Sequence, residues 1–269
     1  MHRKASSLLN TLGVNFERTR TALRGIRPYM RNRREMLGAI RRRESEGKPI
    51  EFPLVKNYPC LHDRFESGGH AWGVYFHMDL WAAQRLFKNR PSEHVDVGSA
   101  VGGFCAHVAS FMPIRVIDIR PTTSSARNLR FEVCDLMDIP DSYVGCTDSL
   151  SCLHTLEHFG LGRYGDPINY DGWRDGWNNL LRMLRPGGTF YFAVPIGRRQ
   201  RIEFDAHRIF SLPFILDDMI ADRLSVRAFA YIDDASEIHH DADPFGPEAR
   251  NTFGLNLGCG VFELEKNPG

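Results

Sequence analysis

His94-Val95-Asp96-Val97-Gly98-Ser99-Ala100-Val101-Gly102-Gly103-Phe104 joins a short apolar strand, a glycine turn and the start of a helix. Glycines let the backbone turn tightly and approach a ligand closely, because no Cβ intervenes. The helix that follows presents free N–H groups at its N-terminus. Asp118 ends the next apolar run, twenty residues past Gly98, where nucleoside-binding α/β folds place an acid for the ribose hydroxyls. The pattern predicts a site for a nucleoside-containing cofactor.

Apolar strands and helices alternate around this stretch. We expect strands near residues 94–98, 114–118, 129–133, 148–153, 188–194, 223–232 and 256–265. Helices are expected near residues 75–89, 101–111, 171–184 and 211–221, with loops over 51–73 and 233–250. Such alternation is typical of a parallel sheet with crossover helices.

Residues 1–50 are expected to form a basic helical arm, followed by a domain over residues 51–269. Pro28 is expected to break or kink this helix. The arm holds 13 Lys/Arg and 4 Asp/Glu, a net charge of +9, whereas the remaining chain holds 21 and 29, a net charge of −8. We expect the arm to dock on the body or on a second subunit. The alternative is contact with anionic lipid or a phosphorylated glycan carrier. The apolar positions of the arm recur at helical spacing: Leu8, Leu12, Phe16, Leu23, Ile26, Met30, Leu37 and Ile40.

The composition is that of a soluble globular protein. The chain has 269 residues, of which 42% are hydrophobic and 25% charged. No apolar run is long enough for a membrane span or strong enough for a secretory signal. The six cysteines form no C-x-x-C pair, so we expect a reducing compartment, no disulfide framework and no structural metal. A cytoplasmic location is therefore expected, at most peripheral to the inner face of the membrane. Nothing indicates nucleic-acid binding, and the oligomeric state is left open.

Two cofactor classes combine a glycine turn with an acid about twenty residues later. Nicotinamide and flavin enzymes use G-x-G-x-x-G to seat a pyrophosphate. Here Gly98 is followed by Ser99 and Ala100, so that spacing is missing. S-adenosylmethionine carries no phosphate, and its site needs only close backbone approach to a methionine carboxylate and a ribose. The sequence therefore favours S-adenosylmethionine.

At this point the chain resembles class I S-adenosylmethionine-dependent methyltransferases. Asp96 to Gly102 is similar to their acid-x-Gly-x-Gly-x-Gly motif, except that Ala100 replaces the middle glycine. Leu184-Arg-Pro-Gly-Gly-Thr-Phe190 is similar to their turn between a helix and the fifth strand, where the glycines would serve as a helix C-cap. The resemblance implies a Rossmann-like α/β sheet, mostly parallel with the last strand antiparallel. It implies these cofactor-binding residues: Asp96, Gly98, Ser99, Gly102, Gly103, Asp118, Ile119, Asp135 and Leu136.

A narrower resemblance covers roughly residues 55–265. It rests on Tyr58–Phe65, Ser149–Ile168, Arg201–Phe210 and Gly258–Glu263. These segments resemble a family known only as a domain of unknown function, found in nematodes and in bacteria, where it is often associated with surface-polysaccharide genes. The resemblance implies a methyltransferase-like protein with a role in polysaccharide biosynthesis. It supplies no established acceptor or catalytic residue.

Methylation of a sugar hydroxyl usually needs a general base near the acceptor. His154, Glu157 and His158 follow the expected fourth strand, and His207 follows the fifth. Histidine suits proton abstraction because its unperturbed pKa lies near neutral pH. Any of the three histidines could be the base, or one could face the cofactor while the others orient the loop.

Two polar segments are expected to contact the acceptor. The glycine-rich loop after His158 carries Arg163 and Tyr164 and suggests a lid. Arg201 lies in a cationic segment after the fifth strand, which suits an acidic or nucleotide-linked sugar. A metal site is not expected, because neighbours in a chain often point in different directions. The cluster considered for one was His239, His240, Asp241 and Asp243.

The leading hypothesis is a class I methyltransferase that transfers a methyl group from S-adenosylmethionine to an oxygen of a sugar or glycan precursor. The alternative is a non-catalytic module of the same fold that binds a glycan or a protein partner. A nicotinamide-dependent enzyme is disfavoured by the missing phosphate cradle.

Overall fold

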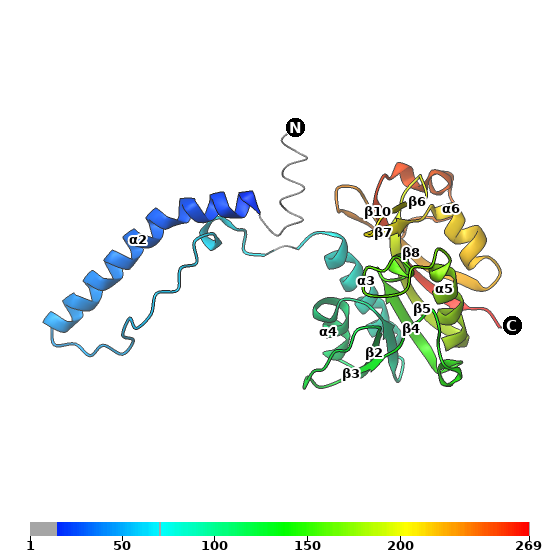
Figure 1. Cartoon of the computed structure of the whole chain (residues 1–269), viewed down its shortest axis with the longest axis horizontal. Helices are drawn as coiled ribbons and strands as arrows, with labels where there is room; N and C mark the ends of the chain where they lie inside the picture. The colour runs from blue at the N-terminus through cyan, green and yellow to red at the C-terminus, as the bar shows by residue number, and fades with distance from the viewer. Residues whose placement is uncertain (1–14, 70, 269) are drawn as a thin grey trace. The chain divides into compact units, whose positions relative to one another are not determined.

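The computed structural model describes residues 15–69 and 71–268. The chain divides into two units, Met1–His70 and Ala71–Gly269 (Figure 1). The structure thus groups the segment after residue 50 with the helix before it. The boundary expected near residue 50 remains a prediction.

The first unit is built on α2 (Phe16–Ser45). The Asn15 side chain caps its N-terminus by accepting the Arg18 N–H at 2.9 Å. Of the break or kink expected at Pro28, the break is wrong, because the helix continues past this residue, and the kink stays a prediction. A proline inside a helix removes one hydrogen bond, and the surrounding arginines are strong helix formers. The part of the expected arm before residue 15 lies outside the described residues.

An extended segment and the short helix η1 (Asp63–Phe65) pack along α2. A Cβ on Gly25 would lie 1.7 Å from the Leu61 carbonyl oxygen, so only glycine permits this approach. Asn57 Oδ1 accepts hydrogen bonds from Arg33 Nε at 2.7 Å and from the Tyr29 hydroxyl at 3.3 Å. Among the described residues, no helix has the length and apolarity needed to cross a membrane.

The second unit contains one large sheet with the strand order β3-β2-β1-β4-β5-β10-β8-β9. Strands β3, β2, β1, β4 and β5 are parallel, and β10 lies antiparallel between β5 and β8. The expected α/β sheet with an antiparallel last long strand is therefore confirmed. The strands are β1 (His94–Val97), β2 (Ile114–Asp118), β3 (Leu129–Val133), β4 (Thr147–Leu153), β5 (Leu184–Ile196), β8 (Leu224–Ile232), β9 (Ile238–His239) and β10 (Gly258–Lys266).

Helices cover both faces of this sheet (Figure 1). One face packs α3 (Val74–Asn89), η2 (Val101–Cys105) and α4 (Ala106–Ala109) against the strands. The other packs α5 (Gly172–Met183), α6 (Leu212–Phe214) and η5 (Ile215–Ile220). The helix expected over 101–111 is thus shorter and begins as a π-turn. The loop expected over 233–250 contains β9 and the start of η6 (Pro247–Gly254).

The glycines near the start of β5 do not cap a helix, contrary to expectation. Helix α5 ends at Met183 and β5 begins at the next residue. Gly187 has φ 74° at a bulge, where the pairing with β4 shifts between Thr147 and Ser149. Glycine accepts this backbone without strain.

Polar residues in the core hold the sheet together beneath the turn after β1. The His94 ring lies between the hydroxyls of Ser149 (2.7 Å) and Ser151 (2.9 Å). Burial lowers the pKa of His94 to about 3, so the ring stays neutral and serves as a satisfied core group.

Candidate functional site

Two adjoining cavities lie where β1, β2, β3 and β4 end, the edge at which open parallel sheets bind ligands. The first has a volume of about 60 Å³ and the second about 610 Å³. The residues that line both are Gly98, Asp118, Arg120, His154 and Tyr164. The first also contacts Ile119, Asp135, Leu136 and His158, and the second Tyr75, Ser99 and Ala100.

The glycine turn is held from below by Asp96. This carboxylate is fully buried and accepts the Ser99 N–H at 3.0 Å and the Ser99 hydroxyl at 2.6 Å. The Ser151 hydroxyl also donates to it. Gly98 has φ 68°, and a Cβ there would lie 2.3 Å from Thr155 Cγ2. Asp96 therefore shapes the turn and lines neither cavity, and the same is true of Gly102 and Gly103.

Asp118 is the last residue of β2, Asp135 follows β3, and both line the first cavity. Arg120 forms a two-pronged ion pair with Asp118, with Nε 2.9 Å from Oδ1 and Nη2 2.8 Å from Oδ2. Asp135 Oδ1 accepts the Met137 N–H at 2.8 Å. The oxygens expected to hold the ribose are thus already engaged by a side chain two residues away.

Tyr164 forms the rim shared by the two cavities. The Arg120 guanidinium lies 4.2 Å from its ring centroid. Its loop is shaped by Asp166, whose carboxylate accepts the backbone N–H groups of Gly160, Gly162 and Tyr164 at 2.8–3.2 Å. Arg163 instead donates to the Ala206 carbonyl at 2.7 Å and lines neither cavity.

His154, Glu157 and His158 form a compact group at the cavity floor. His154 Nδ1 lies 2.9 Å from Glu157 Oε1, and His158 Nε2 lies 3.7 Å from the same oxygen. Glu157 is fully buried. His158 Nδ1 donates to the Ala206 carbonyl at 2.7 Å. His154 has φ 55°, a left-handed backbone that is uncommon for histidine and costs free energy.

The two histidines have opposite electrostatic surroundings. Burial opposes the charged form of His154, but Cys259 and Glu157 raise the pKa of His154 well above its ordinary value. Burial lowers the pKa of His158. Neighbouring groups whose pKa values are pushed apart are typical of acid–base sites.

His207 and Arg201 lie on the hairpin of β6 (Arg201–Glu203) and β7 (His207–Ile209). Glu203 contacts both, at 3.5 Å from His207 Nε2 and 2.8 Å from Arg201 Nε. Neither residue lines the two cavities. The structure therefore brings His154 and His158 together and leaves His207 apart.

Four residues of the site were missed from the sequence. Arg120 stands two residues after Asp118, a spacing that could have suggested the pair. Asp166 precedes a proline after a glycine-rich loop, which is typical of a side chain that organises a turn. Tyr75 and Asp79 are on α3, and nothing local in the sequence indicates that this helix packs against the glycine turn.

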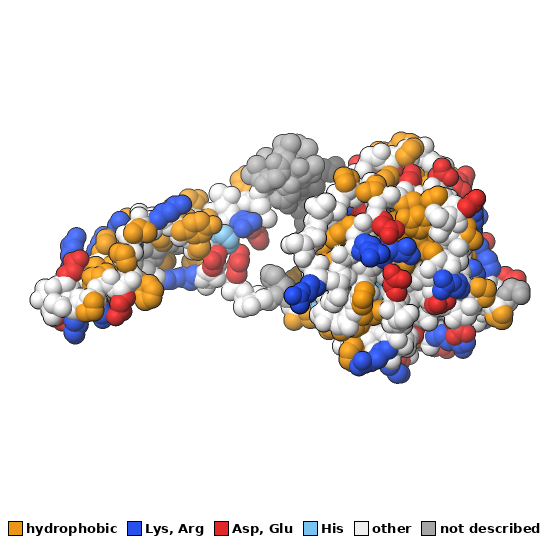
Figure 2. All heavy atoms as spheres, turned by 90° about the horizontal axis from the view of Figure 1, so that it is seen from below, with side chains coloured by type: hydrophobic (Ala, Val, Ile, Leu, Met, Phe, Trp, Pro, Cys, Tyr) orange, Lys and Arg blue, Asp and Glu red, His pale blue; other side chains and the backbone are white. Residues whose placement is uncertain are grey.

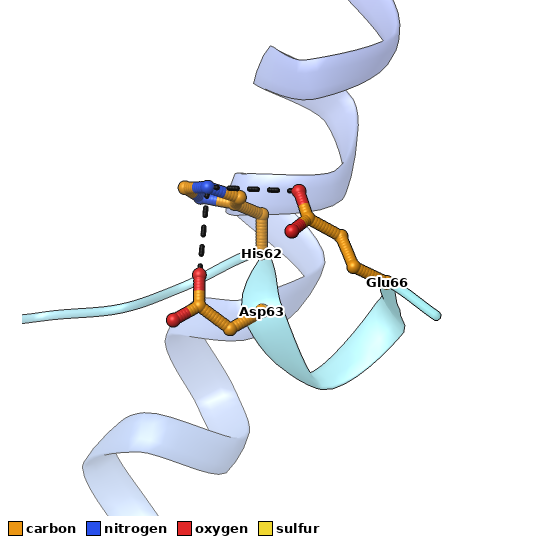
Figure 3. A group of neighbouring side chains, drawn as sticks. All are labelled: His62, Asp63 and Glu66. Atoms are coloured by element: carbon orange, nitrogen blue, oxygen red, sulfur yellow. Dashed lines mark ion pairs between the residues drawn. The ribbon is translucent and has the colours of Figure 1, made fainter. Parts of the chain in front are cut away.

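The cluster considered for a metal does not converge. His239 Nε2 lies 2.8 Å from Asp233, Asp241 lies 3.6 Å from Arg85, and Asp243 accepts the Phe245 N–H. In the described part of the chain, side chains of ligand type gather at His62, Asp63 and Glu66 on the first unit (Figure 3). His62 Nε2 lies 3.4 Å from an Asp63 carboxylate oxygen and 3.7 Å from one of Glu66. The Arg18 guanidinium lies 3.2 Å from the same nitrogen. A cation at that position opposes a metal ion.

The family model described as "Caenorhabditis protein of unknown function, DUF268" matches residues 124–230. The expected resemblance to a nematode family of unknown function is therefore confirmed over that range. Among curated proteins, none matches the chain.

Several solved structures are similar in chain path. The [4+2]-cyclase SpnF has 15% identity and a TM-score of 0.48, with 81% of this chain and 86% of that chain covered. The N-methyltransferase NodS from Bradyrhizobium japonicum WM9, in complex with S-adenosyl-L-homocysteine, has 15% identity and a TM-score of 0.48, with 73% of this chain and 89% of that chain covered. A Burkholderia thailandensis 1,6-didemethyltoxoflavin-N1-methyltransferase has 16% identity and a TM-score of 0.49, with 71% of this chain and 79% of that chain covered. No conclusion about activity follows from likenesses at this identity and TM-score.

Proposed function

We propose that the chain is an S-adenosylmethionine-dependent methyltransferase. The observation that carries the proposal is one shared site: carboxylates follow β2 and β3, a glycine turn follows β1, and a histidine–glutamate pair follows β4. The acids suit ribose hydroxyls and an adenine edge, and Gly98 permits the close backbone approach that the ligand needs. The residues proposed to hold the cofactor are Gly98, Ser99, Asp118, Ile119, Asp135 and Leu136, with Asp96, Gly102 and Gly103 supporting the turn.

S-adenosylmethionine would supply a methyl group on a sulfonium centre. The chain positions the acceptor and takes up its proton. His154 is proposed as the general base because it lines both cavities, and Glu157 orients its ring through Nδ1. His158 is the second candidate. His207 is the third, from the hairpin beyond the cavities.

The proposed acceptor is a hydroxyl group of a sugar or glycan precursor. A hydroxyl needs a base, unlike an amine that is already deprotonated. Tyr75 and Tyr164 both line the second cavity, and their rings offer apolar faces to a sugar. Arg163 and Arg201 are proposed to contact an acidic part of the acceptor after the loop and hairpin move. A place in polysaccharide biosynthesis belongs to this proposal.

The direct test is methyl transfer from labelled S-adenosylmethionine to a panel of nucleotide sugars and glycans. The proposal expects wild-type turnover, a loss of at least about 100-fold in kcat for His154→Gln, and near-normal kcat for His207→Gln. The last variant tests the third candidate base, which lies outside the cavities. Turnover that survives in His154→Gln and disappears in His207→Gln would contradict the assignment of the base.

A non-catalytic module that binds a glycan or a protein partner is the second candidate. The ion pair between His154 and the fully buried Glu157 favours a reactive site over it, because a passive surface has no need of such a pair. Saturable S-adenosylmethionine binding without turnover on any acceptor would favour the module.

We also propose that the arm touches anionic membranes from the cytoplasmic side. Helix α2 exposes Phe16, Leu23 and Met30, and the extended segment exposes Phe52 and Val55. Hydrophobic side chains and those of Lys and Arg lie interspersed on the surface of the first unit (Figure 2). Apolar and cationic side chains together suit a lipid interface. Full-length chain should sediment with anionic vesicles and not with neutral ones, and a chain beginning at residue 71, which lacks the whole first unit, should stay in solution with both.

A further inference from the structure

Asp79 on α3 is a buried carboxyl for which the proposed reaction has no role yet. Its side chain is only 4% exposed. One oxygen, Oδ2, lies where a side chain on Gly103 would be, 2.0 Å from the position of its Cβ. The Phe104 N–H donates to the carboxylate. Among the described residues, no hydrogen bond reaches the other oxygen, Oδ1.

Asp79 is not itself a lining residue of the second cavity, but it packs directly against residues that are close to that lining. Asp79 stands one helical turn after Tyr75, so the two lie on one face of α3, and Tyr75 lines that cavity. Asp79 also packs under the turn whose residues Gly98 to Val101 line the same cavity. A buried carboxylate oxygen with no partner is costly unless a ligand completes it.

Burial, three titratable groups and one backbone N–H set the state of this carboxyl. Burial raises the pKa of Asp79 to about 7, and Asp96 on β1 acts in the same direction. His107 on α4, the Phe104 N–H and His154 after β4 oppose the rise. Near neutral pH the carboxyl is therefore poised, and an added cation would favour its charged form.

We infer that Asp79 binds the α-ammonium group at the amino-acid end of the cofactor. The inference rests on the proposed function, and it follows from which acids remain available. Asp118 is engaged by Arg120, and Asp96 is engaged by Ser99 and Ser151. Asp79 remains, beside the second cavity, and its Oδ1 accepts no hydrogen bond from the described residues.

The test compares two ligands that differ only in that end. S-adenosylhomocysteine carries the amino-acid group, whereas 5′-methylthioadenosine shares its nucleoside and sulfur and lacks that group. Calorimetry on the full chain should show that Asp79→Asn weakens the binding of S-adenosylhomocysteine about 10- to 100-fold, the range for a lost charged hydrogen bond. Affinity for 5′-methylthioadenosine should change less than twofold. Asp148→Asn, an exposed acid paired with Arg185, is the matched control and should change neither.

The outcomes separate this inference from the proposed function. If Asp79→Asn weakens the binding of both ligands equally, or weakens the binding of neither, the ammonium assignment is overturned while cofactor binding by wild type stands. Failure of wild type to bind either ligand would overturn the proposed function itself. A deaminated analogue of S-adenosylhomocysteine gives a second check: it should bind wild type and Asp79→Asn with the same affinity.

Discussion

Arg120 forms a bidentate ion pair with Asp118, in which Nε and Nη2 lie 2.9 Å and 2.8 Å from the two carboxylate oxygens. The same guanidinium lies over the Tyr164 ring, so Asp118, Arg120 and the loop that carries Tyr164 form one connected group. The first cavity is small in this arrangement, at about 60 Å³. A nucleoside that enters it must share or displace the ion pair.

Arg120→Ala is therefore expected to favour cofactor binding. The Arg120 side chain is half exposed, so loss of the pair frees Asp118 at a cost below about 1 kcal/mol. We expect S-adenosylhomocysteine to bind about two- to fivefold tighter, chiefly through a faster association rate in stopped-flow measurements. Arg163→Ala is the matched control and should leave the rate unchanged. A clear loss of affinity in Arg120→Ala would mean that this guanidinium holds the ligand.

Glu157→Gln is expected to lower kcat and shift its pH profile. Glu157 helps to keep the pKa of His154 above the ordinary value, so the free base accumulates only as the pH rises. Activity of wild type should increase with pH above about 6.5. In Glu157→Gln the pKa of His154 falls, so the acidic limb should move to lower pH while the plateau drops about 10- to 100-fold. An unchanged limb, measured as kcat from pH 5.5 to 9, would contradict the pairing.

Asp79→Asn is expected to stabilise the protein at alkaline pH. The pKa of Asp79 is about 7 in the folded state against 3.8 ordinarily. Between these values the unfolded chain loses a proton that the native state keeps, so stability falls as the pH rises through this window. The full cost above pH 7 is roughly 4 kcal/mol. Thermal unfolding should show Tm of Asp79→Asn several degrees above wild type at pH 8 and close to it at pH 4. A lower Tm at pH 8 would show that the charged carboxylate stabilises the fold.

Gly98→Ala and Gly102→Ala are expected to differ, although both glycines belong to the motif. At Gly98 the added Cβ would meet Thr155 Cγ2 at 2.3 Å, and the positive φ of 68° adds strain. We expect a loss of about 2 kcal/mol or more in the free energy of unfolding. At Gly102 no atom lies within 4 Å of the new Cβ, so the change should stay within about 0.5 kcal/mol. Urea titration of both variants measures the contrast, and equal losses would refute it.

The sequence predicted those parts of the site that depend on local pattern. Gly98 and Asp135 follow strands and Asp118 ends one, so strand ends in the sequence become one edge of the sheet. The parallel order and the antiparallel last long strand followed from the resemblance carried by these motifs. His154 and Glu157 were placed together because they are three residues apart after β4.

Other features depend on packing between distant segments. Asp79 meets Gly103 only because α3 lies against the glycine turn, which no periodicity reveals. Asp96 matched a cofactor motif, yet the hydroxyls of Ser99 and Ser151 draw it beneath the turn. Pro28 lies within α2, where the helix on both sides offsets one missing hydrogen bond.

The central claim is that this edge of the sheet binds S-adenosylmethionine through Asp118. Calorimetric titration of the full chain with S-adenosylmethionine and S-adenosylhomocysteine, for wild type, Asp118→Ala and Asp148→Asn, tests it most directly. The account predicts saturable binding of both ligands by wild type and by Asp148→Asn, and a large loss in Asp118→Ala. Absence of binding by wild type, or equal affinity in Asp118→Ala, would contradict it.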